Sequence, residues 1–183
     1  MVDKEDVSQQ IVLASHLHEE FGHALLQDEG CRKLLHQLNR NIDATKSEMV
    51  ATGVVKECAD CAMNGDGTCC GKQTGYKYDS ILLLINLLLR MSLSPKSQDP
   101  YLCYFLTREG CSLRARHVIC VNYLCKRLRA AIPHDRLVRL QGIAGEEIDL
   151  LFILEEYIKK KIRKRNTGKG LNTGQEEKLT ICR

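Results

Sequence analysis

Cysteines carry the most distinctive chemical signal of this chain. The 183 residues include 10 cysteines, and eight of them lie between positions 58 and 125. They form two groups, one with the pattern C-x2-C-x7-C-C and one with the pattern C-x7-C-x8-C-x4-C. The members are Cys58, Cys61, Cys69, Cys70, Cys103, Cys111, Cys120 and Cys125. Because clustered thiolates are the usual ligands of zinc and of iron–sulfur clusters, we expect these eight side chains to bind metal.

The first group contains two features that bear on geometry. Its leading C-x2-C is the spacing of a metal knuckle, in which a tight turn directs two sulfurs at one ion. The side chains of the adjacent Cys69 and Cys70 would point to opposite faces of an extended chain, so they can serve different ions or different parts of one site. Residues 58–75 also hold four of the 13 glycines, which predicts an irregular loop that metal binding would fold.

The sequence leaves the metal and its arrangement open. Eight thiols can supply two sites of four thiolates each, or one cluster with spare ligands. Soft thiolates disfavour magnesium and calcium, whereas zinc and an iron–sulfur cluster both fit. Cys31 and Cys182 lie outside the two groups, and we interpret them as packing residues or spare thiols, because free cysteine is often buried.

The stretch CYFLTREGCSLRARHVIC, followed by VNYLC, resembles the second half of the YkgJ-like cysteine-cluster family, whose members are described as zinc- or iron-chelating. The similarity covers residues 58–125 and starts with a cysteine motif that ends in a Cys-Cys pair. The later matches are Cys103, Phe105, Leu106, Gly110, Cys111, Arg116, Cys120 and Cys125. The spacing between Cys61 and Cys69 is longer than the family's, and His117 stands where the family has proline, which makes it an additional candidate ligand. The resemblance implies chelation and no particular reaction.

Candidates for acid–base or metal chemistry outside the cysteines occur in the stretch HLHEEFGH. His16, Glu20 and His23 share one helical face, and Glu20-x2-His23 has the local form of a di-iron ligand pair. Di-iron sites need matching carboxylates on other helices, and the zinc-protease motif is absent because His18 and His23 are five residues apart. We interpret this face as a solvated or capping face, and no enzymatic reaction is assigned.

A basic run occupies residues 159–165 and carries more positive charge than the net +4 of the whole chain. Its members are Lys159, Lys160, Lys161, Arg163, Lys164 and Arg165. Such a run can bind nucleic acid or an acidic partner, and it also suits the C-terminal end of a helix. No recognition module with interleaved aromatic residues accompanies it.

Three functions follow from these patterns. The first is a metal-binding protein that chelates zinc or an iron–sulfur cluster in a structural or sequestering role. The second is an iron–sulfur redox or radical-type enzyme or accessory protein. The third is a zinc-stabilised protein that binds nucleic acid or an acidic partner.

The elements that must position the cysteines are predicted to be helices. Abundant Leu, Lys, Arg and Glu favour helix over sheet. Apolar periodicity predicts helix over residues 6–39 with a break at Gly30, a turn and short helix over 41–55, and a helix over 79–91 that is capped by Asp79. A long helical pattern follows Pro133. The fold class is therefore mainly α, a small helical bundle with an irregular cysteine-rich metal-binding insertion.

The length suits one domain, which we expect over residues 1–165, with the metal-binding region at 58–125 and a flexible tail at 166–183. The acidic start MVDKEDVSQQ does not resemble an export signal. The apolar run 81–89 is too short to span a membrane. We therefore expect a cytoplasmic protein without a membrane partner, where ten cysteines favour metal chemistry over disulfides.

Overall fold

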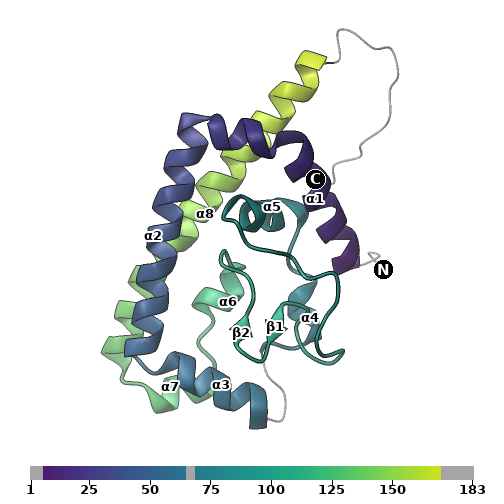
Figure 1. The fold of residues 1–183 in the computed structure, drawn as a ribbon. Helices are drawn as coiled ribbons and strands as arrows, with labels where there is room; N and C mark the ends of the chain where they lie inside the picture. Colours follow the sequence, from purple (N-terminus) through teal and green to yellow (C-terminus); the bar gives the residue numbers. More distant parts are fainter. Residues whose placement is uncertain (1–5, 65–68, 170–183) are drawn as a thin grey trace.

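A computed structural model describes residues 6–64 and 69–169 of the chain, and most of these residues are helical (Figure 1). The predicted mainly α class is confirmed. The helices are α1 (Val7–Gln27), α2 (Glu29–Ala51), α3 (Val54–Asn64), α4 (Lys72–Gly75), α5 (Ser80–Leu88), α6 (Val118–Asn122), α7 (Lys126–Ala131) and α8 (His134–Lys169). Strand β1 (Leu106–Thr107) pairs antiparallel with β2 (Gly110–Cys111) in a two-stranded hairpin.

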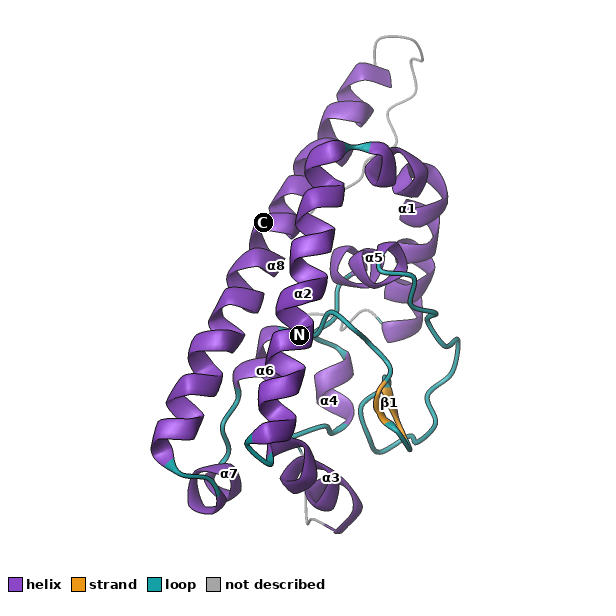
Figure 2. Cartoon of the chain, turned by 60° about the vertical axis from the view of Figure 1, so that its left-hand side comes forward, coloured by secondary structure: helices purple, strands orange, loops and turns teal. Residues whose placement is uncertain are grey.

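The two longest helices, α2 and α8, run side by side in opposite directions, as Figures 1 and 2 both show. Their apolar residues recur at helical spacing and face each other. Leu35, Leu38 and Ile42 of α2 belong to the same buried cluster as Leu154 and Ile158 of α8. We call this cluster the large core. This helical pair is the frame to which the cysteine-bearing segments are attached.

Helix α5 fills the space between α1 and the α2–α8 pair and is apolar on nearly all sides. Its buried polar residue, Asn86, connects it to the segment that leads to α6. The Asn86 amide donates to the Ala115 carbonyl at 2.9 Å and accepts from the backbone N–H groups of Arg114 at 2.8 Å and Ala115 at 3.0 Å. Because every polar atom of this side chain is thereby paired in the core, Asn86 fixes where residues 114–115 run.

The first predicted helical break is displaced by two residues. The chain turns at Asp28, which ends α1 and whose carboxylate caps α2 by accepting from the Cys31 N–H at 2.9 Å. Gly30 lies in the first turn of α2, so the prediction of a break at Gly30 was wrong. Glycine is needed there for another reason, because a Cβ would overlap the hydroxyl of Tyr157 on α8.

Two further predictions were wrong in the region before the cysteine pair. Residues 41–51 form no turn but continue α2, and α3 follows Gly53, which adopts a positive φ of 84°. Residues 58–64 belong to α3 and not to a loop. The glycines that suggested a loop all come after Asn64, so they do not disturb the helix.

The predicted cap of α5 by Asp79 is confirmed, because its carboxylate accepts from the Leu82 N–H at 2.8 Å. Helix α8 passes through Gly142 and Gly145 without a break and continues to Lys169, so it includes the first residues of the expected tail. The rest of that tail, 170–183, lies outside the described residues. None of the helices in the described part of the chain combines the length and apolar character of a membrane span.

Candidate metal centre

Cys58 and Cys61 lie on α3, and their i, i+3 spacing places them on one face of this helix. The prediction that C-x2-C forms a tight turn is therefore wrong. The helix nevertheless presents both sulfurs on the same side, as a metal knuckle would. Both side chains are half-buried.

Cys70 and Cys103 come from different sequence groups but lie on paired backbone segments. The Cys103 N–H donates to the Cys70 carbonyl at 2.7 Å, and an isolated antiparallel bridge joins Gly71 with Leu102. The Lys72 N–H donates to the Tyr101 carbonyl at 3.2 Å. Cys103 is buried and Cys70 is half-buried, and both pack with the large core. This pairing brings the end of the first group to the start of the second.

Cys111 reaches the same region through the β1–β2 hairpin. Gly110 adopts a φ of 109°, a conformation that favours glycine, and the register pairs Cys111 with Leu106. The Leu106 N–H donates to the Cys103 carbonyl at 2.9 Å. The hairpin therefore returns Cys111 toward Cys103, although Cys111 remains exposed.

Cys120 is held by Tyr78, a residue that the sequence analysis did not single out. The Tyr78 hydroxyl donates to the Cys120 sulfur at 3.4 Å and accepts from the His117 N–H at 3.2 Å. The ring packs edge-on against Phe105, with the ring centroids 4.9 Å apart. Burial, reinforced by the charges of nearby thiolates, raises the pKa of Tyr78, so the hydroxyl keeps its proton and remains a donor.

Cys125 and Cys58 share a second, smaller apolar cluster. This small core consists of Met49, Val54, Val121, Leu128, Ile132, Leu137, Leu140 and Ala144, with Cys58 and Cys125 packed against it. Cys125 is the N-cap residue of α7, which contacts α3. An ion pair between Arg127 and Glu57, with atoms 2.9 Å apart, joins these two helices. The last cysteine of the second group thus lies beside the first group.

The electrostatics of the thiols show how close the groups are. Burial raises the pKa of Cys58 to about 11, and repulsion from Cys69, Cys125 and Cys61 adds to the shift. Burial also raises the pKa of Cys103 to about 11, with a smaller contribution from Cys111 and Cys120 that the hydrogen bond from the Phe105 backbone opposes.

The adjacent pair joins this network. A hydrogen bond with Cys69 and burial raise the pKa of Cys70, and the charges of Cys120 and Cys103 act in the same direction. Each of the eight predicted ligands therefore interacts with at least one other.

The side chains are nevertheless not arranged as a finished coordination sphere. Within residues 6–64 and 69–169, no group of three or more His, Cys, Asp or Glu side chains has the geometry of a metal site. All nine cysteines in these ranges are free thiols. Eight thiols are donors that suit a soft metal. Their closeness also suits a metal, because neighbouring thiolates repel one another until a cation neutralises them.

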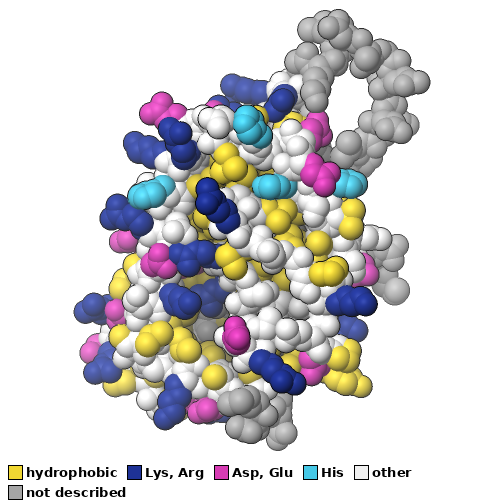
Figure 3. Space-filling model, viewed as in Figure 1, with side chains coloured by type: hydrophobic (Ala, Val, Ile, Leu, Met, Phe, Trp, Pro, Cys, Tyr) yellow, Lys and Arg dark blue, Asp and Glu magenta, His cyan; other side chains and the backbone are white. Residues whose placement is uncertain are grey.

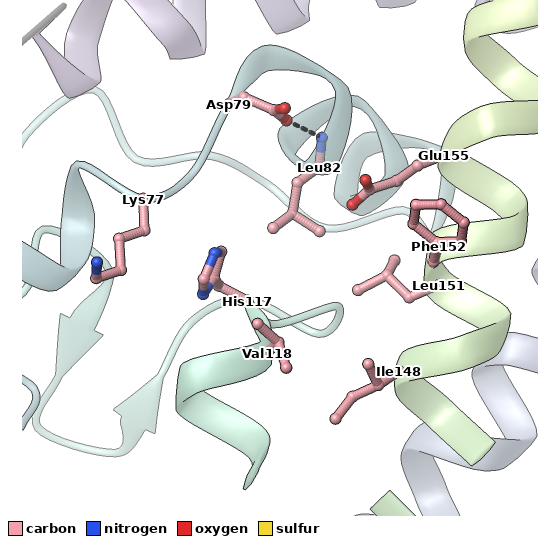
Figure 4. Close-up of a pocket in the computed structure, with 9 residues that line it drawn as sticks. All are labelled: Lys77, Asp79, Leu82, His117, Val118, Ile148, Leu151, Phe152 and Glu155. Carbon is pink, nitrogen blue, oxygen red and sulfur yellow. Dashed lines mark hydrogen bonds between the residues drawn. The ribbon is translucent and has the colours of Figure 1, made fainter. Parts of the chain in front are cut away.

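His117, the additional candidate, is the N-cap residue of α6. Its Nδ1 accepts from the Ile119 N–H at 3.2 Å, and burial lowers the pKa of the imidazole. The ring lines a pocket of about 290 Å³ between α8, the start of α6 and the start of α5 (Figure 4). The pocket is lined by Lys77, Asp79, Leu82, His117, Val118, Ile148, Leu151, Phe152 and Glu155.

This pocket was not predicted. In Figure 4 the carboxylates of Asp79 and Glu155 lie at one end of it, and apolar side chains from α8 form its wall. Burial and the charge of Asp79 raise the pKa of Glu155. Nothing in the local sequence pattern distinguishes Glu155 from other polar residues of α8.

The other candidates do not form a site. His16, Glu20 and His23 are all exposed on α1. In the basic run, Lys159 contacts Glu156 at 3.0 Å and Lys161 contacts Asp28.

Other cations of the run also have neighbours. Arg163 lies 3.9 Å from Glu156, and Arg165 lies over the ring of Phe21, 5.7 Å from its centroid. On the face of the molecule that Figure 3 draws, Lys and Arg lie among acidic and apolar side chains.

Comparisons of the chain with protein-family models, with curated proteins and with solved structures found no match. The resemblance of residues 58–125 to the YkgJ-like family stays a prediction.

Proposed function

We propose that this protein chelates zinc or an iron–sulfur cluster through the thiolates of its eight clustered cysteines, in a structural or sequestering role. One observation carries the proposal. Two cysteine groups that are more than thirty residues apart in the sequence are brought together, with the backbones of Cys70 and Cys103 joined by a hydrogen bond of 2.7 Å. Free thiols gain little from such crowding, whereas metal ligands require it.

A structural role suits the short helices that contain or adjoin the ligands. Helices α4, α6 and α7 have 4, 5 and 6 residues, and helices this short are unstable without tertiary support. Structural zinc supplies apparent binding free energies of roughly 10–16 kcal/mol, which is enough to hold such elements together. A cytoplasmic location would keep the thiols reduced and available.

The contacts of the basic run do not favour nucleic-acid binding as a second function. Lys159, Lys161 and Arg163 each face a carboxylate of the same chain. Phosphate binding would have to compete with these partners. No contact in the described residues favours the redox-enzyme alternative over simple chelation.

The test is purification of the full-length protein without oxygen, followed by elemental analysis and a visible spectrum. We expect at least about one equivalent of zinc or iron per chain, and an iron–sulfur cluster would give a brown solution. C31S is the matched control, because Cys31 is buried in α2 outside the cluster, and it should retain the full metal content. Less than about half an equivalent, both as purified and after reconstitution, would refute the proposal.

A further inference from the structure

Five of the eight thiols pack in two different apolar surroundings, and the division does not follow the sequence groups. Cys103 belongs to the large core, and Cys70 and Cys120 pack against it. Cys58 and Cys125 pack against the small core. Each surrounding therefore contains cysteines from both sequence groups.

The thiols near the small core are held together by an ion-pair clamp. Arg127 lies two residues after Cys125, and its guanidinium contacts Glu57 at 2.9 Å and Asp60 at 3.9 Å. These two carboxylates alternate with Cys58 and Cys61 along α3, since each immediately precedes a cysteine in the sequence. The clamp thus keeps the cysteine-bearing helix α3 beside the N-terminal end of α7, where Cys125 is the N-cap.

The thiols near the large core are held by backbone pairing and by Tyr78. The Cys70–Cys103 hydrogen bond, the β1–β2 hairpin that returns Cys111, and the Tyr78 contact to the Cys120 sulfur at 3.4 Å involve none of the residues of the clamp. The two sets are therefore positioned by independent parts of the fold.

The adjacent cysteines lie where the two sets meet. Cys69 is exposed and Cys70 is half-buried against the large core, so the pair faces two environments. The Thr74 hydroxyl donates to the Cys69 carbonyl at 2.6 Å and fixes this turn. Cys70 stays with Cys103 through the backbone pairing, and the exposed Cys69, which does not pack against the large core, is left to complete the small-core set.

Resting on the proposed metal-binding function, we propose that the chain holds two separate tetrathiolate metal sites whose ligands cross between the sequence groups. The first site consists of Cys58, Cys61, Cys69 and Cys125. The second site consists of Cys70, Cys103, Cys111 and Cys120. Four thiolates complete the tetrahedral shell of zinc in each.

Arg116 supports two sites with a shared counter-charge. It directly follows Ala115, a residue of the large core. Its guanidinium also contacts the Met49 sulfur at 3.4 Å, in the small core. A positive charge between two anionic tetrathiolate centres reduces their mutual repulsion.

Cobalt titration of the reduced, full-length protein under anaerobic conditions tests the assignment, because thiolate-bound Co²⁺ absorbs strongly in the visible and near-ultraviolet. The wild type and C31S should bind about two equivalents. C58S/C125S removes two ligands from the first site only, so about half of the thiolate-to-cobalt absorption should remain. C103S/C125S damages both sites and should abolish it. Far-ultraviolet circular dichroism verifies that each variant keeps its helices.

The opposite pattern would overturn the proposal that each site takes ligands from both sequence groups. If C103S/C125S keeps half of the absorption and C58S/C125S keeps none, the sites follow the sequence groups. Loss of all absorption in both double variants would show one shared cluster and would equally overturn it. Failure of the wild type to bind Co²⁺ would overturn the two tetrathiolate sites, whereas the proposed function is refuted only if zinc and iron also stay below about half an equivalent.

A second measurement needs no substitution. In protein loaded with ¹¹³Cd²⁺, scalar couplings between the metal and cysteine Hβ protons assign each cysteine to one cadmium resonance. We expect the Cys125 protons to correlate with the same cadmium as those of Cys58. Correlation with the cadmium of Cys103 would overturn the proposal.

Discussion

Asp28 offers the sharpest test of how the helical frame is held, because one carboxylate serves three partners. It caps α2 through the Cys31 N–H at 2.9 Å, accepts from the Tyr157 hydroxyl at 2.7 Å and pairs with Lys161. We expect Asp28→Ala to lower the free energy of unfolding by about 2–3 kcal/mol, from a lost cap of ~1 kcal/mol and a lost hydrogen bond to a charged acceptor. Urea unfolding at pH 7 measures the difference.

The charge of Asp28 can be separated from its capping role by pH. The hydrogen bonds from Lys161 and Tyr157 lower the pKa of Asp28 from 3.8 to about 2. Since the folded-state pKa is the lower one, the ionised carboxylate contributes stability above pH 4, and this contribution is lost as the pH falls through 2. Asn caps helices as well as Asp does, so Asp28→Asn should cost about 1 kcal/mol at pH 7 after solvent screening, and almost nothing at pH 2.

The control is Asp43→Asn, which removes a carboxylate that faces Arg114 at 2.7 Å on a largely exposed surface. Exposed pairs of this kind contribute ~0.2–1 kcal/mol, so its effect at pH 7 should be smaller than that of Asp28→Ala. An Asp28→Asn penalty that stays constant between pH 2 and pH 5, or an Asp28→Ala penalty no larger than the control, would refute the reasoning.

Three other substitutions test separate parts of the structure. Tyr78→Phe keeps the packing on Phe105 but leaves the His117 N–H without its acceptor, so chemical denaturation should show a loss of about 1–3 kcal/mol. Gly30→Ala places a methyl group against Tyr157 and should lower the thermal midpoint, whereas Gly142→Ala meets open space on α8 and should not lower it. Glu147 is 1% exposed beside Thr45, and burial raises the pKa of its carboxyl. Because a buried carboxylate is costly, Glu147→Met should raise the free energy of unfolding by at least ~1 kcal/mol at pH 7. A decrease would contradict this.

The sequence predicted correctly those helices and caps that depend on residues close together in the chain. The Asp79 cap and the long helix after Pro133 depend on residues within one or two turns, and both are present. The continuation of α2 was missed because Asn41 suggested a turn, although Ile42, Thr45 and Met49 continue the buried stripe of the helix. Burial against α8 outweighs the weak preference of Asn for turns.

The sequence predicts which cysteines belong to the candidate site but not how they are arranged in space. The eight cysteines could be chosen from spacing alone, but Cys70 meets Cys103 through a backbone pairing across 33 residues. Cys125 comes to Cys58 through the ion pair of Arg127 with Glu57, 70 residues apart. Contacts between distant residues leave no periodic signal in the sequence, so their pairing could not be inferred.

The pairing of α2 with α8 also determines the topology of the cysteine region. The Asn41 side chain donates to the Glu146 carbonyl at 3.1 Å, so this frame closes a chain loop of 105 residues that contains all eight clustered cysteines. The entropic cost of closing such a loop rises only slowly with its length and is met by the helices themselves. Metal binding to cysteines inside this loop then has to close only shorter segments of chain between the ligands. Removal of metal should therefore open α6 and α7 to hydrogen exchange while the amides of α2 and α8 stay protected.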